Sequence, residues 1–218
     1  MVAVTPQHYS HCARELLKLA SKPNPDAQRL YREVASKVPE GVTVVLDKNN
    51  RMLKRYGGGV YGVGDLVSKV LKAELPKGDV IVVSRQDPVT LAHEAGHAAF
   101  NESLVGRVLQ SRVARGAAGL AGAGALAAGA AGGAKLGPLG GALLGASVPF
   151  LLSSPTLIGE AVASHKGVER LREAGMSEEQ IDKAKKQLTD AFFTYAKQPL
   201  RAGAGGALVG GVAGWARS

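Results

Sequence analysis

The sequence predicts an α+β protein that is mostly helical, with a small sheet, and that is interrupted by a helical hairpin rich in glycine and alanine. Three observations lead to this prediction: two β-branched runs at residues 41–47 and 78–84, several amphipathic helical patterns, and long uncharged stretches between residues 116 and 159. The chain has 218 residues, which is enough for one good core together with a membrane-associated part.

Residues 1–40 are expected to form two short amphipathic helices, over residues 10–22 and 25–38. Asn24 and Pro25 begin the second helix as its cap and first-turn residue. The first residues show no basic region followed by an apolar one, so we expect no cleaved secretory signal. His8 and His11 are interpreted as packing or surface residues.

Composition limits the function classes. Cys12 is the only cysteine, which excludes an internal disulfide framework and a cysteine-rich zinc knuckle, so any metal site must use histidines and carboxylates. The net charge is +9, but the basic residues are scattered and no basic helix accompanies them, so we expect no nucleic-acid partner. Arg107, Arg112 and Arg115 stand just before a long uncharged segment, which instead favours an anionic lipid surface.

Residues 41–112 contain the two predicted strands and two further helices. Between the strands, residues 55–75 are expected to form a glycine-rich turn that leads into a helix. Gly62-Val63-Gly64 in this stretch lacks the spacing of a nucleotide-binding loop, so we interpret it as a flexible turn. After the second strand, Asp87 as N-cap and Pro88 at the first helical position begin a helix.

This helix carries the stretch His93-Glu94-Ala95-Gly96-His97. Residues four apart lie on one face of a helix, so His93 and His97 can both face one metal ion. Glu94 lies beside that face, where it could act as a general base on zinc-activated water and pass the proton to the leaving amine. The small residues Ala95 and Gly96 would let substrate or a neighbouring strand approach. The alternative is an ordinary amphipathic helix with two core or surface histidines.

Residues 113–159 are expected to form a glycine- and alanine-rich hairpin. Residues 116–134 and 136–159 contain no charge, and these runs of 19 and 24 residues match the length of about 20 that crosses a bilayer. Glycines at small-xxx-small spacing allow close helix pairing in lipid. We favour a transmembrane hairpin, and a buried helical pair in a soluble assembly is the alternative.

Two crossings would return the chain to the side that it left, where Glu160 is the first charged residue. Residues 160–199 are expected to form water-facing helices that supply the third ligand. His93, His97 and Glu160 would then form a set with an open fourth position, as in catalytic zinc sites. The alternative for Glu160 is an acidic residue at a helix start, where the helix dipole favours it.

Several motifs in this order resemble a bacterial family of membrane neutral zinc metallopeptidases. They are HEAGHA, an uncharged hairpin, Glu160-Ala-Val-Ala-Ser164, and Thr194-Tyr195, within residues 79–200. More distant relatives are the membrane gluzincins of the heat-shock and prenyl-endopeptidase type. The prenyl-endopeptidase relatives usually have an aspartate where this chain has Ser164. The resemblance implies a zincin-like fold, Zn²⁺ bound by His93, His97 and Glu160, and Glu94 as catalytic base.

Other residues could assist such a site. Ser164, one turn after Glu160, could orient that ligand through a hydrogen bond. Tyr195 could donate to a developing oxyanion, although a core or interfacial tyrosine is the favoured interpretation. His165 lies about 140° round the helix from Glu160, so we expect it off the ligand face.

The chain ends in another glycine-rich segment. A capping box at Ser177 and Gln180 begins a helix that is expected to run to Pro199. Within residues 200–218, the uncharged stretch 202–216 could join upstream residues in a tilted third span, form a re-entrant segment or pack on the hairpin, with Trp215 at an interface.

The sequence therefore favours a membrane-associated zinc peptidase that acts on peptides or proteins. The strand at residues 79–84, if it lies at a sheet edge, could bind substrate by strand addition. The three arginines outnumber the lone Lys135 at the hairpin tip, which puts the zinc site on the cytoplasmic side. The competing hypothesis is a membrane-inserting or assembly-forming glycine-zipper protein with a non-catalytic HExxH, which could form homo-oligomers through its glycine-rich helices.

Overall fold

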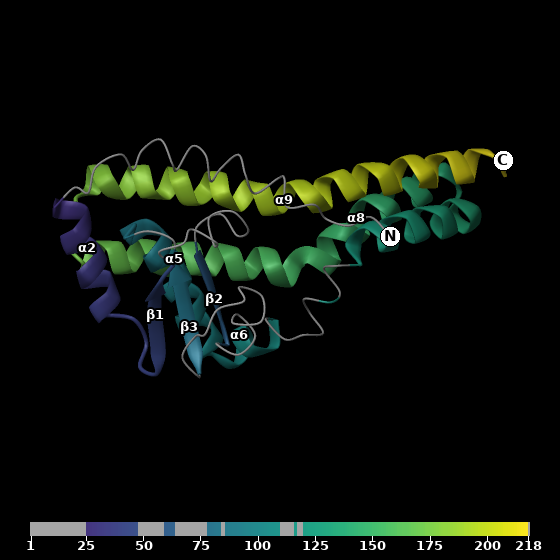
Figure 1. The fold of residues 1–218 in the computed structure, drawn as a ribbon. Coiled ribbons are helices and arrows are strands. Elements are labelled where there is room, and N and C mark those ends of the chain that lie inside the picture. The colour runs from purple at the N-terminus through teal and green to yellow at the C-terminus, as the bar shows by residue number, and fades with distance from the viewer. Residues whose placement is uncertain are drawn as a thin grey trace. The chain divides into compact units, whose positions relative to one another are not determined.

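We analysed a computed structural model of the chain, which describes residues 25–47, 59–63, 78–83, 86–109, 116 and 120–217 (Figure 1). The chain divides into two compact units. Unit 1 comprises Met1–Glu102 and Val162–Thr189, and unit 2 comprises Ser103–Ala161 and Asp190–Ser218. The described residues are mostly helical, with one small sheet. This confirms the predicted balance of helix and strand.

Unit 1 contains a three-stranded sheet in the order β1-β3-β2. The strands are β1 (Val42–Leu46), β2 (Gly59–Val63) and β3 (Asp79–Val83). β3 pairs in parallel with β1 and antiparallel with β2. The four residues from Val80 to Val83 are all buried, as expected for a β-branched central strand that is covered on both faces.

The central place of β3 corrects one prediction. We expected that the strand at residues 79–84 could lie at a sheet edge and bind an extended peptide. Both of its sides are already paired, so its backbone has no row of groups left for a substrate. The edges of the described sheet are β1 and β2.

β2 was not predicted as a strand. Its residues, Gly59–Val63, fall within the stretch that we interpreted as a glycine-rich turn, and Gly62 is part of the strand. Glycines weaken the local signal of a strand, so its pairing with β3 determines this structure. The helix expected after this turn, and the helix expected at residues 10–22, lie outside the described residues.

The predicted helices of unit 1 are confirmed where the structure describes them. α2 (Pro25–Ser36) buries Leu30, Tyr31 and Val34, and α5 (Pro88–Asn101) begins at the predicted cap. The Asp87 carboxylate accepts hydrogen bonds from the backbone N–H groups of Val89 and Thr90. These helices share one apolar core with the sheet and with the parts of α8 and α9 that belong to this unit.

α8 (Ala121–Glu173) and α9 (Glu178–Trp215) are joined by a short turn at Gly175, whose φ of +82° favours glycine. The predicted capping box is present. The backbone N–H of Gln180 donates to the Ser177 hydroxyl, and the Gln180 side chain accepts from the backbone N–H of Ser177.

Unit 2 contains the predicted hairpin. α8 is interrupted at Gly137, whose φ of 75° and ψ of −177° lie in a region that is nearly exclusive to glycine. The two arms then run side by side, because a Cβ on Gly124 would contact Leu152 and one on Gly132 would contact Leu144. α6 (Leu104–Leu109) precedes the hairpin along the chain.

The C-terminal part of α9 packs against both arms. A Cβ on Gly206 would overlap Gly145 and lie 2.7 Å from the carbonyl oxygen of Ala125, and one on Gly210 would overlap Gly141. α9 does not end at Pro199 as predicted, but continues to Trp215. Residues 202–216 are thus both continuous with the upstream helix and packed on the hairpin.

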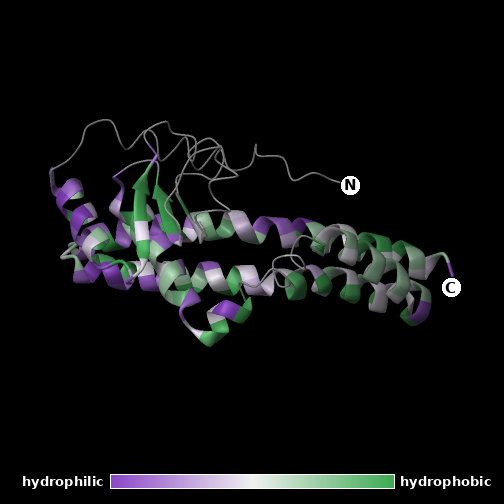
Figure 2. Ribbon diagram, turned by 60° about the horizontal axis from the view of Figure 1, so that its bottom comes forward, coloured by the Kyte–Doolittle hydropathy of each residue, from purple (hydrophilic) through white to green (hydrophobic). Residues whose placement is uncertain are grey.

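The described surface of unit 2 is rich in exposed apolar side chains. Many large apolar side chains are exposed on its helices, including Leu126, Leu139, Leu143, Leu151, Leu208 and Val212. The helices that end near the label C in Figure 2 are coloured mostly green and pale, with few hydrophilic residues. By length and composition, α8 could cross a membrane, and only 22% of its most apolar window is buried.

Candidate metal centre

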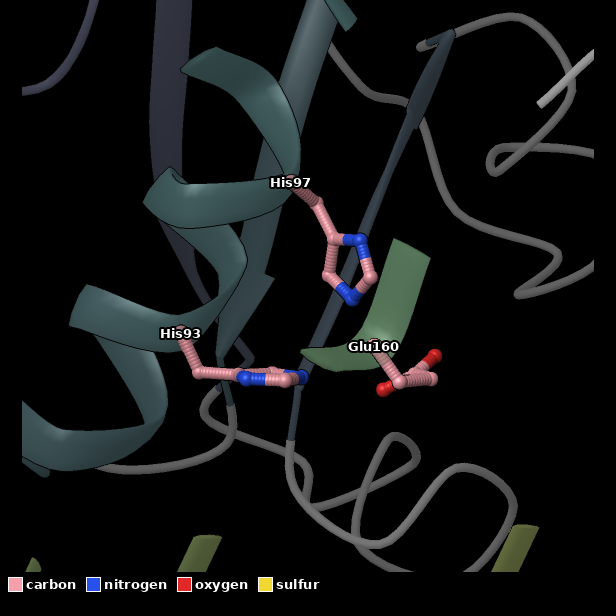
Figure 3. A group of neighbouring side chains, drawn as sticks. All are labelled: His93, His97 and Glu160. Atoms are coloured by element: carbon pink, nitrogen blue, oxygen red, sulfur yellow. The ribbon is translucent and has the colours of Figure 1, made fainter. Parts of the chain in front are cut away.

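The two histidines of the HExxH stretch project from one face of α5 (Figure 3). β3 and the Asp87 cap fix where this helix starts, so His93 and His97 follow on successive turns. Their ring centroids are 4.8 Å apart and the ring planes meet at 85°. Both side chains are partly buried, and a ring nitrogen of each faces the carboxylate of Glu160.

Glu160 completes a cluster that could hold a metal ion. One ligand atom from each of His93, His97 and Glu160 can be chosen so that all lie within 4.8 Å of one another. Zinc with tetrahedral bonds of 2.0–2.2 Å needs ligand atoms about 3.4 Å apart, so small side-chain rotations would close the site. Two imidazoles and one carboxylate are ligands that zinc accepts, and the donor set therefore fits this ion.

Glu160 lies in the middle of α8, which continues unbroken from Pro138 to Glu173. It is therefore not an acidic residue at a helix start, and that alternative is wrong. Its side chain is 9% exposed. Partners that are positive or that donate hydrogen bonds compensate for the lost hydration of a buried carboxylate, and a bound cation would be one such partner.

A close contact between α5 and α8 brings Glu160 to the histidines. A Cβ on Gly96 would overlap the carbonyl oxygen of Ala163, and one on Gly167 would lie 3.1 Å from the backbone of Ala92. These four residues belong to unit 1, and Glu160 lies less than one turn before Ala163 on the same helix. We expected Gly96 to admit substrate or a strand, but its neighbour is α8.

Glu94 is the other buried acid of the stretch, with 9% exposure. It follows His93 directly but does not belong to the described cluster of possible ligands. A carboxylate next to a metal ligand, but outside the ligand set, is the arrangement that proton transfer at such a site requires.

Ser164 contacts a histidine rather than Glu160. Its hydroxyl lies 3.3 Å from Nδ1 of His93. We expected this serine to orient Glu160, and it is indeed one turn further along the same helix, but the hydrogen bond in the structure is to His93. If the serine oxygen accepts the proton of Nδ1, Nε2 keeps the lone pair that a metal needs.

Among the described residues, the group of possible ligands does not include the other candidates. His165 is 75% exposed and pairs with Glu169 at 3.3 Å, which confirms that it is off the ligand face. Tyr195 is partly buried on α9 and belongs to unit 2. His8, His11 and Cys12 lie outside the described residues.

A polar cluster at the C-terminal end of α5 was not predicted. The Tyr61 hydroxyl donates to Asp79 at 2.8 Å and accepts from the Asn101 amide at 3.1 Å. Burial raises the pKa of Tyr61 to about 12, and Asp79 adds to the shift. Asn101 is one turn after His97, so this cluster ties β2 and β3 to the end of the histidine helix. In the sequence, the only sign of this cluster was Asn101, a polar residue one turn after the HExxH stretch.

Comparison of the chain with protein-family models, with curated proteins and with solved structures gives no match. Any functional assignment therefore depends on the residues of the site.

Proposed function

We propose that the protein is a zinc-dependent peptidase held in a membrane by unit 2, and that its resemblance to membrane neutral zinc metallopeptidases reflects a shared activity. One observation carries the proposal. Glu160, which is 67 positions after His93, has a carboxylate oxygen within 4.8 Å of the possible ligand atoms of the histidine pair. Three convergent donors of the types that zinc accepts are hard to explain as an ordinary helix contact.

In this proposal His93, His97 and Glu160 bind the ion and leave one coordination position for water or substrate. A bound Zn²⁺ would supply Lewis acidity, which polarises a peptide carbonyl and makes water more acidic. Glu94 accepts the proton of the attacking water and then delivers it to the amine of the leaving peptide. Ser164 holds the ring of His93 in the orientation that presents Nε2.

Two substitutions test the proposal. Glu94→Gln is expected to keep bound zinc and to lose peptide cleavage, because only proton transfer is removed. Glu160→Gln is expected to lower zinc affinity by more than about 100-fold, since changes in residues that merely support ligands already cost 10–100-fold. Glu169→Gln is the matched control, because Glu169 lies on the same helix but is exposed and pairs with His165.

The measurements are metal content by elemental analysis, zinc affinity by chelator competition, and cleavage of a fluorescently labelled unfolded protein. Full cleavage by Glu94→Gln would overturn its assigned role. Stoichiometric iron in place of zinc, or equal zinc affinity for Glu160→Gln and Glu169→Gln, would overturn the zinc site.

The membrane part of the proposal is supported by the exposed leucines of unit 2 and by the length of α8. We also propose that the zinc side is cytoplasmic, on the weight of the arginines before the hairpin. Arg107 is exposed, whereas Arg112 and Arg115 lie outside the described residues.

The glycine-zipper alternative is less well supported. Gly129, Gly133, Gly141, Gly206 and Gly210 all face backbone of the neighbouring helices within the same chain. Small faces that are already packed in this way are not available to pair with other copies. This favours an anchoring bundle over an assembly built through these glycines.

A further inference from the structure

We infer that the substrates are membrane-anchored polypeptides, and that the scissile bond lies within the first few residues outside the bilayer. This inference rests on the proposed function. It comes from the position of Glu160 along α8, since the same unbroken helix carries both the apolar stretch and the possible ligand.

The apolar stretch ends next to Glu160. The helix has no charged residue from Pro138 to Gly159, and from Glu160 to Glu173 it carries many. These 22 uncharged residues would extend about 33 Å at 1.5 Å per residue, close to the thickness of about 30 Å of the hydrocarbon core. On α8 alone, the lipid boundary therefore falls near Ile158, which is 44% exposed.

Residues on α9 give a second estimate of where the lipid boundary lies. A Cβ on Gly203 would lie 2.8 Å from the carbonyl oxygen of Ala146, so Arg201, two residues earlier, is roughly level with Val148. A side chain on a helix leans toward the helix N-terminus, which for α9 is the end away from the hairpin tip. The exposed guanidinium can thus reach the lipid surface near the level of Ser153.

The two limits place the boundary between Ser153 and Ile158. Glu160 is two to seven residues further along the helix, or about 3–10 Å outside the hydrocarbon. A peptide bond at the metal would then be separated from the bilayer by roughly one to three extended residues, at about 3.3 Å each, plus any slack.

Exposed apolar side chains also follow α5 along the chain. Leu104, Val105 and Val108 on α6 are 72%, 61% and 61% exposed, and Leu104 follows Asn101 by only three residues. Both elements that carry the possible ligands are thus continuous in sequence with apolar segments suited to lipid. A polypeptide anchored in the same bilayer would be present at a high effective concentration near the possible metal site, whereas a dissolved polypeptide would not.

The first experiment measures depth without activity. Full-length chains with Cys12→Ser and one new cysteine, Leu151→Cys, Ile158→Cys or His165→Cys, carry a fluorophore in vesicles of phosphatidylcholine and phosphatidylglycerol. These positions lie at seven-residue spacing on one face of α8 and are 70%, 44% and 75% exposed. We expect brominated lipid to quench strongly at 151, weakly at 158 and not at 165. Equal quenching at 151 and 165, or none at 151, would overturn the inference.

The second experiment compares two substrates with the same disordered segment of about 40 residues. One is attached to a transmembrane helix of leucine and alanine, and the other is free in solution. The wild-type chain with zinc is expected to cut the anchored segment mainly in its first ten or so residues, and to cut the free one at least about tenfold more slowly.

Equal rates, or cuts spread evenly along the anchored segment, would overturn the inference and leave the peptidase intact. If neither substrate is cut in a manner that depends on Glu94, the proposed function itself fails, and the inference fails with it. The depth measurement separates these cases, because it does not require turnover.

Discussion

At the scale of single residues, the hydroxyl of Ser164 occupies the position from which it can select the tautomer of His93. The two side chains are 3.3 Å apart, and Ser164 follows Glu160 by one helical turn. One turn of α8 therefore contributes Glu160, a possible ligand, and Ser164, which can orient the possible ligand His93. A hydroxyl is a weaker acceptor than a carboxylate, so this serine should leave His93 a less basic ligand than an aspartate would.

Ser164→Ala is expected to weaken zinc binding by about 10–100-fold, because Nδ1 of His93 loses the group that fixes its ring. Ser164→Asp is expected to restore or tighten zinc binding. The control is Ser154→Ala on the same helix, whose hydroxyl bonds the carbonyl of Leu151. Chelator competition measures these affinities, and equal values for Ser164→Ala and Ser154→Ala would contradict the assigned contact.

Tyr61 predicts a pH dependence of stability. Its pKa is raised from 10.0 to about 12, mainly because burial disfavours the phenolate. A group whose folded-state pKa is raised contributes stability that is complete below its unfolded pKa and is lost as the pH rises through the folded value. Unfolding free energy should thus fall between about pH 10 and 12.

Tyr61→Phe should remove the part of this fall that comes from Tyr61, together with one late step in the phenolate absorbance of the five tyrosines. Burial also raises the pKa of Tyr31, which contributes separately. Tyr195→Phe, outside the cluster, should leave that late step in place. Tyr31→Phe identifies the contribution of Tyr31, and late absorbance that is unchanged in Tyr61→Phe would contradict the assignment to Tyr61.

At the scale of secondary-structure elements, the site depends on how closely two helices approach. α5 and α8 touch through backbone at Gly96 and Gly167, which shortens the distance that the ligand side chains must bridge. Larger residues there would move the helices apart, and Glu160 would move away from the histidines with α8. The glycine of the HExxH stretch therefore has a packing role as well as any role in the site.

Gly96→Ala is expected to destabilise the protein by about 1–3 kcal/mol, since the new methyl group overlaps Ala163 in a packed contact. It should also weaken zinc binding, because Glu160 is displaced. Gly122→Ala, at a helical glycine with no atom within 4 Å of the new Cβ, should be neutral or slightly stabilising. Thermal unfolding with and without zinc measures both effects. An unchanged zinc-dependent increase in Tm for Gly96→Ala would contradict this account.

At the scale of the whole molecule, the two units differ in the solvent that suits their surfaces. Unit 1 buries its apolar side chains in one core with the sheet, as a protein in water does. Unit 2 packs small residues inside and exposes leucines outside, the pattern expected where lipid surrounds the helices. α8 and α9 each contribute residues to both units.

Leu151→Lys is expected to impair membrane insertion, because a lysine inside the hydrocarbon is unfavourable, with a cost that reaches about 2.5–3.5 kcal/mol at the centre of a span. Leu151 is 70% exposed, and Leu136→Lys is a matched control because Leu136 is 65% exposed beside Lys135 at the hairpin tip. The fraction of protein retained in membranes after alkaline extraction gives the comparison. Equal retention of the two variants would argue against lipid at residue 151.

Much of unit 1 could be predicted from local signals. The β-branched runs of β1 and β3, the Asp87 cap of α5 and the Ser177 capping box all depend on residues within a few positions of one another. The histidine pair was recognisable for the same reason, because spacing along one helix determines which side chains share a face. Glu160 could be proposed only from charge pattern and from a resemblance.

The sequence by itself thus determined the strands rich in valine, the helix starts and the histidine pair, since these follow from propensity, capping and periodicity over short distances. Only the tertiary structure decided that β3 is central, that Gly59–Val63 pairs with it, that Ser164 meets His93, and that α9 continues past Pro199. Each of these depends on contacts between residues far apart in the chain, whose free energy exceeds the local preferences of glycine and proline.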